Sequence, residues 1–209
     1  MACILLILSI QSCLGVPPIT LISVFSQLPL LQSLQIFGVL SAAIPSIMAC
    51  LPNLIALDTD YRPHGNYHLP STPLPHLQQL TIRVNLIDAS KVDELWNWTC
   101  SLIPHEGSLQ FFSIMSFEVE VAIPLSFATR LIHRHGLSLT QFRVVAQVTP
   151  EVLTYLCREC PNLALLDCSV TGVDMVRQVL SIPSAIKNRL LANDRKSYRT
   201  RQEPSYTPL

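Results

Sequence analysis

A pair of cysteines has the spacing of a known reactive motif. Cys157 and Cys160 form a C-x-x-C sequence, which is typical of a redox dithiol or of half a zinc site. A second pair of ligands at finger-like spacing is absent from the chain, and Cys160 occupies a position that leucine fills in three similar segments. We therefore interpret the pair as core thiols and expect no metal and no cofactor.

Histidines and alternating carboxylates are the other candidates for chemistry. His133 and His135 are alternate residues of a predicted helix and do not share a face, so a favourable interaction with the helix C-terminus explains them more simply. Carboxylates two apart in a strand do share a face and could form an acid–base pair. Two such pairs are present: Asp58 with Asp60, and Glu118 with Glu120. Neither is accompanied by a glycine-rich turn or a nucleophile elbow, so we expect no enzyme activity.

The elements that position these residues follow from an apolar phrase that recurs seven times, Leu-x-x-Leu-x-Ile with relaxed substitutions. The copies begin at Leu5, Leu31, Leu54, Leu77, Leu109, Leu139 and Leu163. Their starts are 26, 23, 23, 32, 30 and 24 residues apart, which is the period of a solenoid. Each unit has an apolar edge that only its neighbour can cover, so stacking of the units stabilises the fold.

The segments between the phrases indicate helical crossovers. We expect a helix over residues 88–103 and another over residues 126–135. The apolar face of the first consists of Val92, Leu95, Trp96, Thr99 and Leu102. Thr149 and Pro150 predict a third helix start, as N-cap and first helical residue. Residues 41–51 contain Pro45 and predict an irregular or 3₁₀-like crossover, whereas residues 61–75 read as a long surface loop. Four strands are preceded by a Leu-Pro or Cys-Pro phrase, in which proline sets an extended entry.

Composition narrows the class of protein. Hydrophobic residues make up 49% of the 209 residues and charged residues 13%, with a formal net charge of +0. A neutral chain lacks the basic surface of a nucleic-acid binder, and no apolar run approaches the ~20 residues of a membrane span. The seven cysteines are scattered without a disulfide-like rhythm, which favours a cytoplasmic or nuclear protein.

The N-terminal run has two interpretations. Residues 1–16 are apolar and end in small residues, as in a signal peptide, but no positive charge precedes the apolar core. They also fit the phase of the repeats, and we favour a first, shortened repeat. If residues 1–15 are instead a signal peptide, the protein is secreted, and Asn97 becomes a glycosylation acceptor.

The phrases resemble leucine-rich repeats over about residues 4–182. This resemblance implies an irregular α/β solenoid, with a parallel concave sheet and with helices and irregular turns on the convex side. We expect about seven repeats over residues 1–186 and a disordered, basic tail over residues 187–209. The uneven spacing, the LPNL and CPNL phrases and the long Trp-bearing crossover are similar to the repeat halves of fungal F-box proteins, the substrate receptors of ubiquitin ligases. The F-box itself is not found in the chain, so contact with a ligase core would require an F-box upstream.

The resemblance also implies a binding surface. In leucine-rich repeats the residue between the last two apolar positions of the phrase, and the residue after them, face the concave side. The candidate binding residues are Gln35, Phe37, Asp58, Asp60, Thr81, Arg83, Ser113, Met115, Arg143 and Asp167. We expect them to bind a protein, as the substrate-recognition part of an F-box-type receptor. The alternatives are a secreted leucine-rich-repeat binding protein and a degenerate fragment without independent function.

Overall fold

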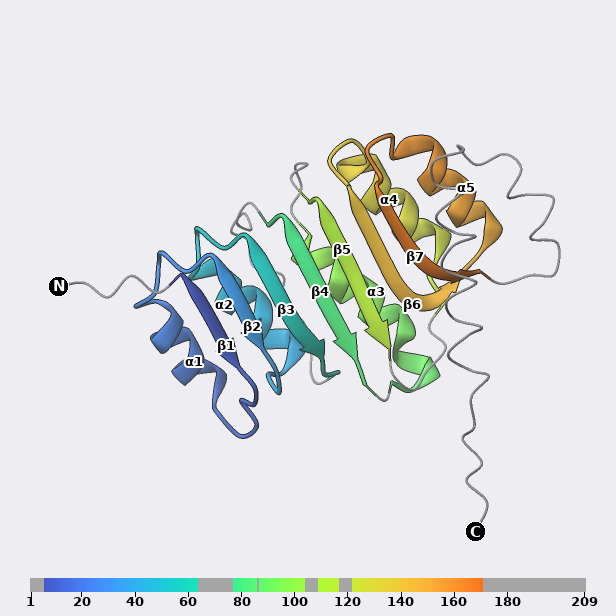
Figure 1. Ribbon diagram of the computed structural model, residues 1–209. Coiled ribbons are helices and arrows are strands. Elements are labelled where there is room, and N and C mark those ends of the chain that lie inside the picture. The colour runs from blue at the N-terminus through green and yellow to red at the C-terminus, as the bar shows by residue number, and fades with distance from the viewer. Residues whose placement is uncertain (1–5, 64–76, 86, 104–108, 117–121, 171–209) are drawn as a thin grey trace, which may run out of the picture.

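Seven strands form a single parallel sheet, whose spatial order is the order of the chain (Figure 1). The computed structural model describes residues 6–63, 77–85, 87–103, 109–116 and 122–170. The strands are β1 (Ile7–Ile10), β2 (Ser33–Ile36), β3 (Ala56–Tyr61), β4 (Gln79–Val84), β5 (Phe111–Ser116), β6 (Gln141–Val148) and β7 (Leu165–Val170). β1 and β7 lie at opposite ends of the sheet, which is not closed into a barrel.

Helices connect the strands and lie on one face of the sheet, behind it in Figure 1. The described segments contain α1 (Pro18–Phe25), α2 (Ile44–Ala49), α3 (Val92–Leu102), α4 (Leu125–His135) and α5 (Pro150–Glu159). Short 3₁₀ turns, η1 (Ser41–Ala43) and η2 (Ala89–Lys91), precede α2 and α3. The protein therefore has an α/β architecture in which the opposite face of the sheet carries no described helix. Most of the predicted loop and all of the predicted tail, residues 64–76 and 171–209, lie outside the described residues.

The strands pair in the register that the apolar phrase predicts. The second apolar residue of each phrase lies beside its counterpart on the next strand, from β1 to β7. Seven residues form this row: Leu8, Leu34, Leu57, Leu80, Phe112, Phe142 and Leu166. All except the half-buried Leu8 are buried beneath the helices. A slip of one residue would move such a row to the other face, so the buried row fixes the register.

Two of the predicted helices agree closely with the structure. Helix α4 ends at His135, and Gly136 follows as its C-cap. Helix α5 begins at Pro150, and its N-cap Thr149 accepts a hydrogen bond from the main chain of Val152 at 3.5 Å. The sequence signals of cap, proline and terminal glycine therefore determine where these helices begin and end.

The predicted helix over residues 88–103 begins later than expected. Asp88 accepts a hydrogen bond from the main chain of Ser90 and precedes the 3₁₀ turn, so α3 itself starts at Val92. The expected apolar face is largely present, with Leu95, Trp96, Thr99 and Leu102 buried. Trp98 is also buried, although the predicted face omitted it.

Asparagines of the proline phrases join neighbouring units. Asn53 donates a side-chain hydrogen bond to the main-chain carbonyl of Pro29 at 2.8 Å. Asn162 makes the same kind of bond to the carbonyl of Leu137 at 2.7 Å. Each bond satisfies a turn carbonyl of the preceding unit, so the phrase both ends a crossover and ties it to the unit before.

The N-terminal run contributes an edge strand. Ile7–Ile10 pairs with β2, as the phase of the repeats predicts. Helix α1 follows after Pro17 and was not predicted. Among the described residues, no helix is both long and apolar enough to cross a bilayer.

Candidate functional site

The uncovered face of the sheet brings together the candidate binding residues. One row crosses the strands in register and consists of Gln35, Asp58, Thr81, Ser113, Arg143 and Asp167. A second row lies two residues further along the strands and contains Asp60, Arg83 and Met115. Phe37, directly after β2, contacts this second row through Arg83. Residues that are far apart in the chain thus lie in two adjacent rows on one face of the sheet.

Hydrogen bonds connect the polar residues of this face from β1 to β4. Ser9 donates to Oε1 of Gln35 at 2.6 Å, and Nε2 of Gln35 donates to Asp58 at 3.0 Å. Arg83 donates to both carboxylate oxygens of Asp58, from Nε at 3.0 Å and from Nη2 at 2.8 Å. This bond raises the pKa of Arg83 above its ordinary value. These bonds hold Gln35, Asp58 and Arg83 in a fixed geometry.

Arg83 also stacks on an aromatic ring. Its guanidinium carbon lies 4.9 Å from the centroid of Phe37, within the range of a cation–π contact. The two-pronged bond to Asp58 holds the plane of the guanidinium while the ring supports one side of it. Together these three residues form an aromatic and arginine cluster of the kind that dominates protein interfaces.

Two of the candidate residues are less accessible than the sequence suggests. Asp60 is 4% exposed and Ser113 is 1% exposed, so neither is the exposed surface residue that was predicted. The hydroxyl of Ser113 has no hydrogen-bond partner in the described structure. It lies on the wall of a small hollow of about 130 Å³, which is also lined by Met115, Arg143 and Asp167. The ion pair of Arg143 with Asp167 is longer than that of Arg83, at 3.4 Å.

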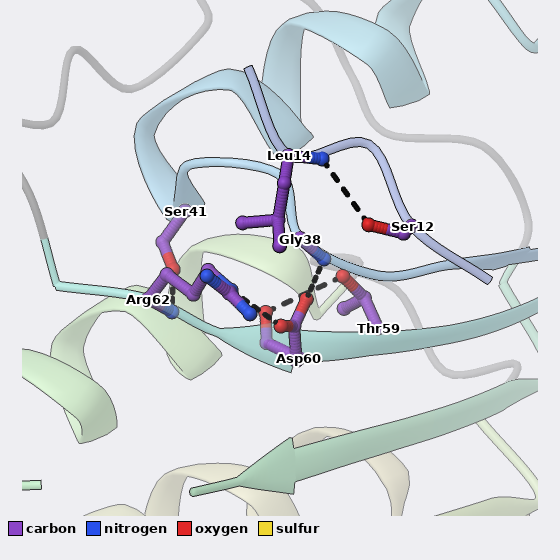
Figure 2. A network of polar contacts seen from close by, with 7 residues as sticks. All are labelled: Ser12, Leu14, Gly38, Ser41, Thr59, Asp60 and Arg62. Carbon is purple, nitrogen blue, oxygen red and sulfur yellow. Dashed lines mark hydrogen bonds and ion pairs between the residues drawn. The ribbon is translucent and has the colours of Figure 1, made fainter. Parts of the chain in front are cut away.

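Asp60 organises the loop ends instead of facing a partner (Figure 2). Its Oδ1 accepts a hydrogen bond from the main chain of Gly38 at 2.9 Å, and its Oδ2 accepts one from Nε of Arg62 at 2.7 Å. Gly38 has a φ of 79°, and a side chain there would lie 3.1 Å from the main-chain nitrogen of Cys13. Only glycine allows this close approach in the left-handed conformation, and Asp60 secures it.

A larger hollow opens beside this network. It has a volume of about 640 Å³ and lies where β1 to β4 end, between the loops that follow them. Its lining is mainly apolar and includes Val16, Val39 and Tyr61, with Asp60 and Arg62 as charged groups. No sequence pattern predicts this hollow, because its walls come from loops that only the stacking of the units brings together.

The C-x-x-C pair is buried in the core. Burial raises the pKa of Cys157 to about 11, and burial together with the neighbouring thiol raises that of Cys160 to about 12. A reactive or metal-binding cysteine requires a lowered pKa. Both thiols are therefore protonated at neutral pH, and the structure supports their interpretation as core residues.

We expect the alkylation of these thiols in the folded chain to be slow. At pH 8 a small alkylating reagent should modify Cys157 and Cys160 at least about tenfold more slowly than the half-buried Cys50, because the reagent attacks the thiolate. Mass spectrometry of peptides after timed quenching measures each rate. The chain unfolded in urea serves as control and should show similar rates at all three positions. Fastest reaction at Cys157 or Cys160 in the folded chain would contradict the core interpretation.

The remaining candidates occupy unrelated places. His133 is exposed on α4, whereas His135 is buried at its end, so the two imidazoles do not face a common point. Asn97 is exposed on α3. Glu118 and Glu120 lie outside the described residues.

Comparisons with protein-family models, with curated proteins and with solved structures gave no match.

Proposed function

We propose that this chain is a leucine-rich-repeat solenoid that binds a protein through the uncovered face of its sheet. The observation that carries the proposal is the row of side chains that crosses this face in register from β2 to β7, all of which except Ser113 are accessible. Stacking of like units is what the recurring phrase and the sequential strand order favour. We further propose that the bound protein is a substrate presented to a ubiquitin ligase, as the likeness of the phrases to fungal F-box proteins implies.

The chemistry of the face suits a protein partner. The aromatic ring of Phe37 and the thioether of Met115 supply apolar anchors, and charged pairs of both signs surround them. Interfaces combine such anchors with polar rims, and arginine, aromatic residues and methionine are enriched in them. Because Arg83 is already held by Asp58 and Phe37, little side-chain entropy is lost when a partner packs against it.

Charge reversal at the centre of this face should abolish binding. We expect Arg83→Glu to reduce capture of the partner at least about tenfold, since it removes an anchor and places a second carboxylate beside Asp58. Quantitative mass spectrometry of proteins captured by the tagged full chain measures the effect. Thr81→Leu tests the same region by adding apolar bulk beside Asp58 without introducing a charge that competes for its carboxylate.

The matched control is Arg134→Glu, a charge reversal at an exposed position of α4 on the helical side. It should leave capture unchanged, and circular dichroism should show all three variants folded. Proteins that both sheet variants lose and the control keeps are the partners. If every protein captured by the wild type is also captured by both sheet variants, the uncovered face is not the binding surface. Loss of partner ubiquitination on deletion of the chain tests the ligase role separately.

A further inference from the structure

The N-terminal end of the molecule exposes apolar side chains from a stretch of the chain that contains no charged residue. Of the eleven exposed large apolar residues in the described structure, seven lie between residues 6 and 30. They are Leu6, Ile7, Leu14, Val16, Ile19, Val24 and Leu30. Ile7 on β1 and Ile19 on α1 are the most exposed of them, at 71% and 72%. Soluble monomers rarely expose apolar residues in such concentration, and contiguous patches of them mark interfaces.

The sequence explains why this end is uncharged. The first acidic, basic or histidine residue of the chain is Asp58, so residues 1–57 contain none of the 14 basic, 14 acidic and 6 histidine residues. Elsewhere in the chain, every unit carries charged side chains on its solvent-facing positions. The asymmetry makes the two ends of the sheet chemically different.

Strand β1 is also an open edge. It pairs with β2 on one side, and among the described strands none lies on its other side (Figure 1). Proteins protect such edges with lysine, proline, bulges or inward-pointing charges. The four residues of β1, Ile-Leu-Ser-Ile, provide none of these. The edge therefore offers unpaired main-chain groups within an apolar surrounding, which suits the addition of another strand.

We infer that this end, formed by β1 and α1, is a dimer interface that takes a second copy of the same chain. The two β1 strands pair antiparallel about a twofold axis perpendicular to the sheet, and the two α1 helices then lie side by side on the same face. A twofold axis places a surface against itself, so a patch of one charge would repel its own copy, whereas an uncharged patch does not.

The dimer leaves the uncovered face of both copies accessible. The axis keeps the two sheets coplanar, so the uncovered faces of the two copies lie on the same side of the dimer. The inference rests on residues 6–30 and not on the proposed binding function. The dimer interface and the proposed binding function can therefore be disproved independently of each other.

The test is the oligomeric state of the full chain in solution. Sedimentation velocity from about 1 to 100 µM should show a reversible monomer–dimer equilibrium. Ile7→Lys places a charge on the edge strand, and Ile19→Glu places one on α1. Each should raise the dissociation constant at least about tenfold, because the transfer of an isoleucine side chain out of water is lost and like charges meet across the axis. Leu137→Lys, at an equally exposed apolar position after α4, is the matched control and should leave the constant unchanged.

Three outcomes would overturn the inference. The first is a monomer over the whole range. The second is a dimer that both variants form as tightly as the wild type. The third is flotation of the wild type with neutral phosphatidylcholine vesicles in place of dimerisation, which would assign the end to a lipid surface. If Ile7→Lys does not fold, Ile19→Glu and hydrogen exchange of the wild type test the dimer instead. The amides of β1 should be protected at high protein concentration and should exchange faster on dilution. Exchange that is independent of concentration would equally rule out the pairing.

Discussion

Replacement of Trp98 by alanine is expected to lower the free energy of unfolding by about 3 to 5 kcal/mol. The indole is 1% exposed, and its Nε1 donates a hydrogen bond to the main-chain carbonyl of Ser41 at 2.8 Å. Its ring also packs against Tyr61, with centroids 5.2 Å apart. The substitution leaves a cavity, an unsatisfied carbonyl and an unsupported aromatic ring at once. Urea titration followed by circular dichroism measures the change.

Two further variants separate these contributions. Trp98→Phe keeps an aromatic ring but leaves the carbonyl of Ser41 without its donor, and should cost about 1 to 3 kcal/mol. Asn97→Ala alters an exposed neighbour in the same helix and should cost less than about 0.5 kcal/mol. An alanine variant of Trp98 that is as stable as the Asn97 variant would contradict the packing of α3 against the units before it.

Trp98 also shows where prediction from sequence ends. The 3.6-residue period placed the apolar face of the helix correctly through Leu95 and Leu102. A helical period identifies one face, however, and Trp98 lies beside that face. It is buried because η1 and β3, which begin 57 and 42 residues earlier in the chain, pack against it. No local pattern encodes such a contact, since it depends on how the units stack.

Helix α1 was not predicted for a related reason. The prediction of amphipathic helices depends on polar residues that alternate with apolar ones, and Pro18–Phe25 contains only threonine and serine as polar residues. Its N-cap is Pro17, which makes no side-chain capping bond. Strands, by contrast, were predictable throughout, because the phrase repeats the same spacing and one row of leucine and phenylalanine fixes the register.

The two carboxylates of β3 show how far the candidate site can be predicted from the sequence. Asp58 and Asp60 are two residues apart, face the same side and belong to the same predicted surface. The structure gives them different roles, because Asp58 meets Arg83 on the open part of the sheet while Asp60 lies under the loop of Gly38. The repeat predicts the side to which a residue points, but the loops that cover it are not part of the repeat.

This difference predicts unequal effects of the same substitution. We expect Asp60→Ala to lower the free energy of unfolding by about 2 kcal/mol, because the main-chain N–H of Gly38 and the Nε of Arg62 both lose their acceptor. Asp58→Ala should cost less than about 1 kcal/mol, because its pair with Arg83 is partly exposed and water replaces it. Urea titrations of both variants, side by side with the wild type, measure the two values.

The asparagine variants refine the comparison. Asp60→Asn retains an oxygen that accepts from Gly38 and should recover part of the loss, whereas Asp58→Asn should resemble Asp58→Ala in stability. For partner capture the order reverses: the Asp58 variants release Arg83 from its fixed position on the binding face, and Asp60→Asn leaves that face intact. Equal stability losses at the two positions would mean that Asp60 is as accessible as Asp58. The loop of Gly38 would then not be anchored by a carboxylate, and Asp60 would belong to the proposed binding surface.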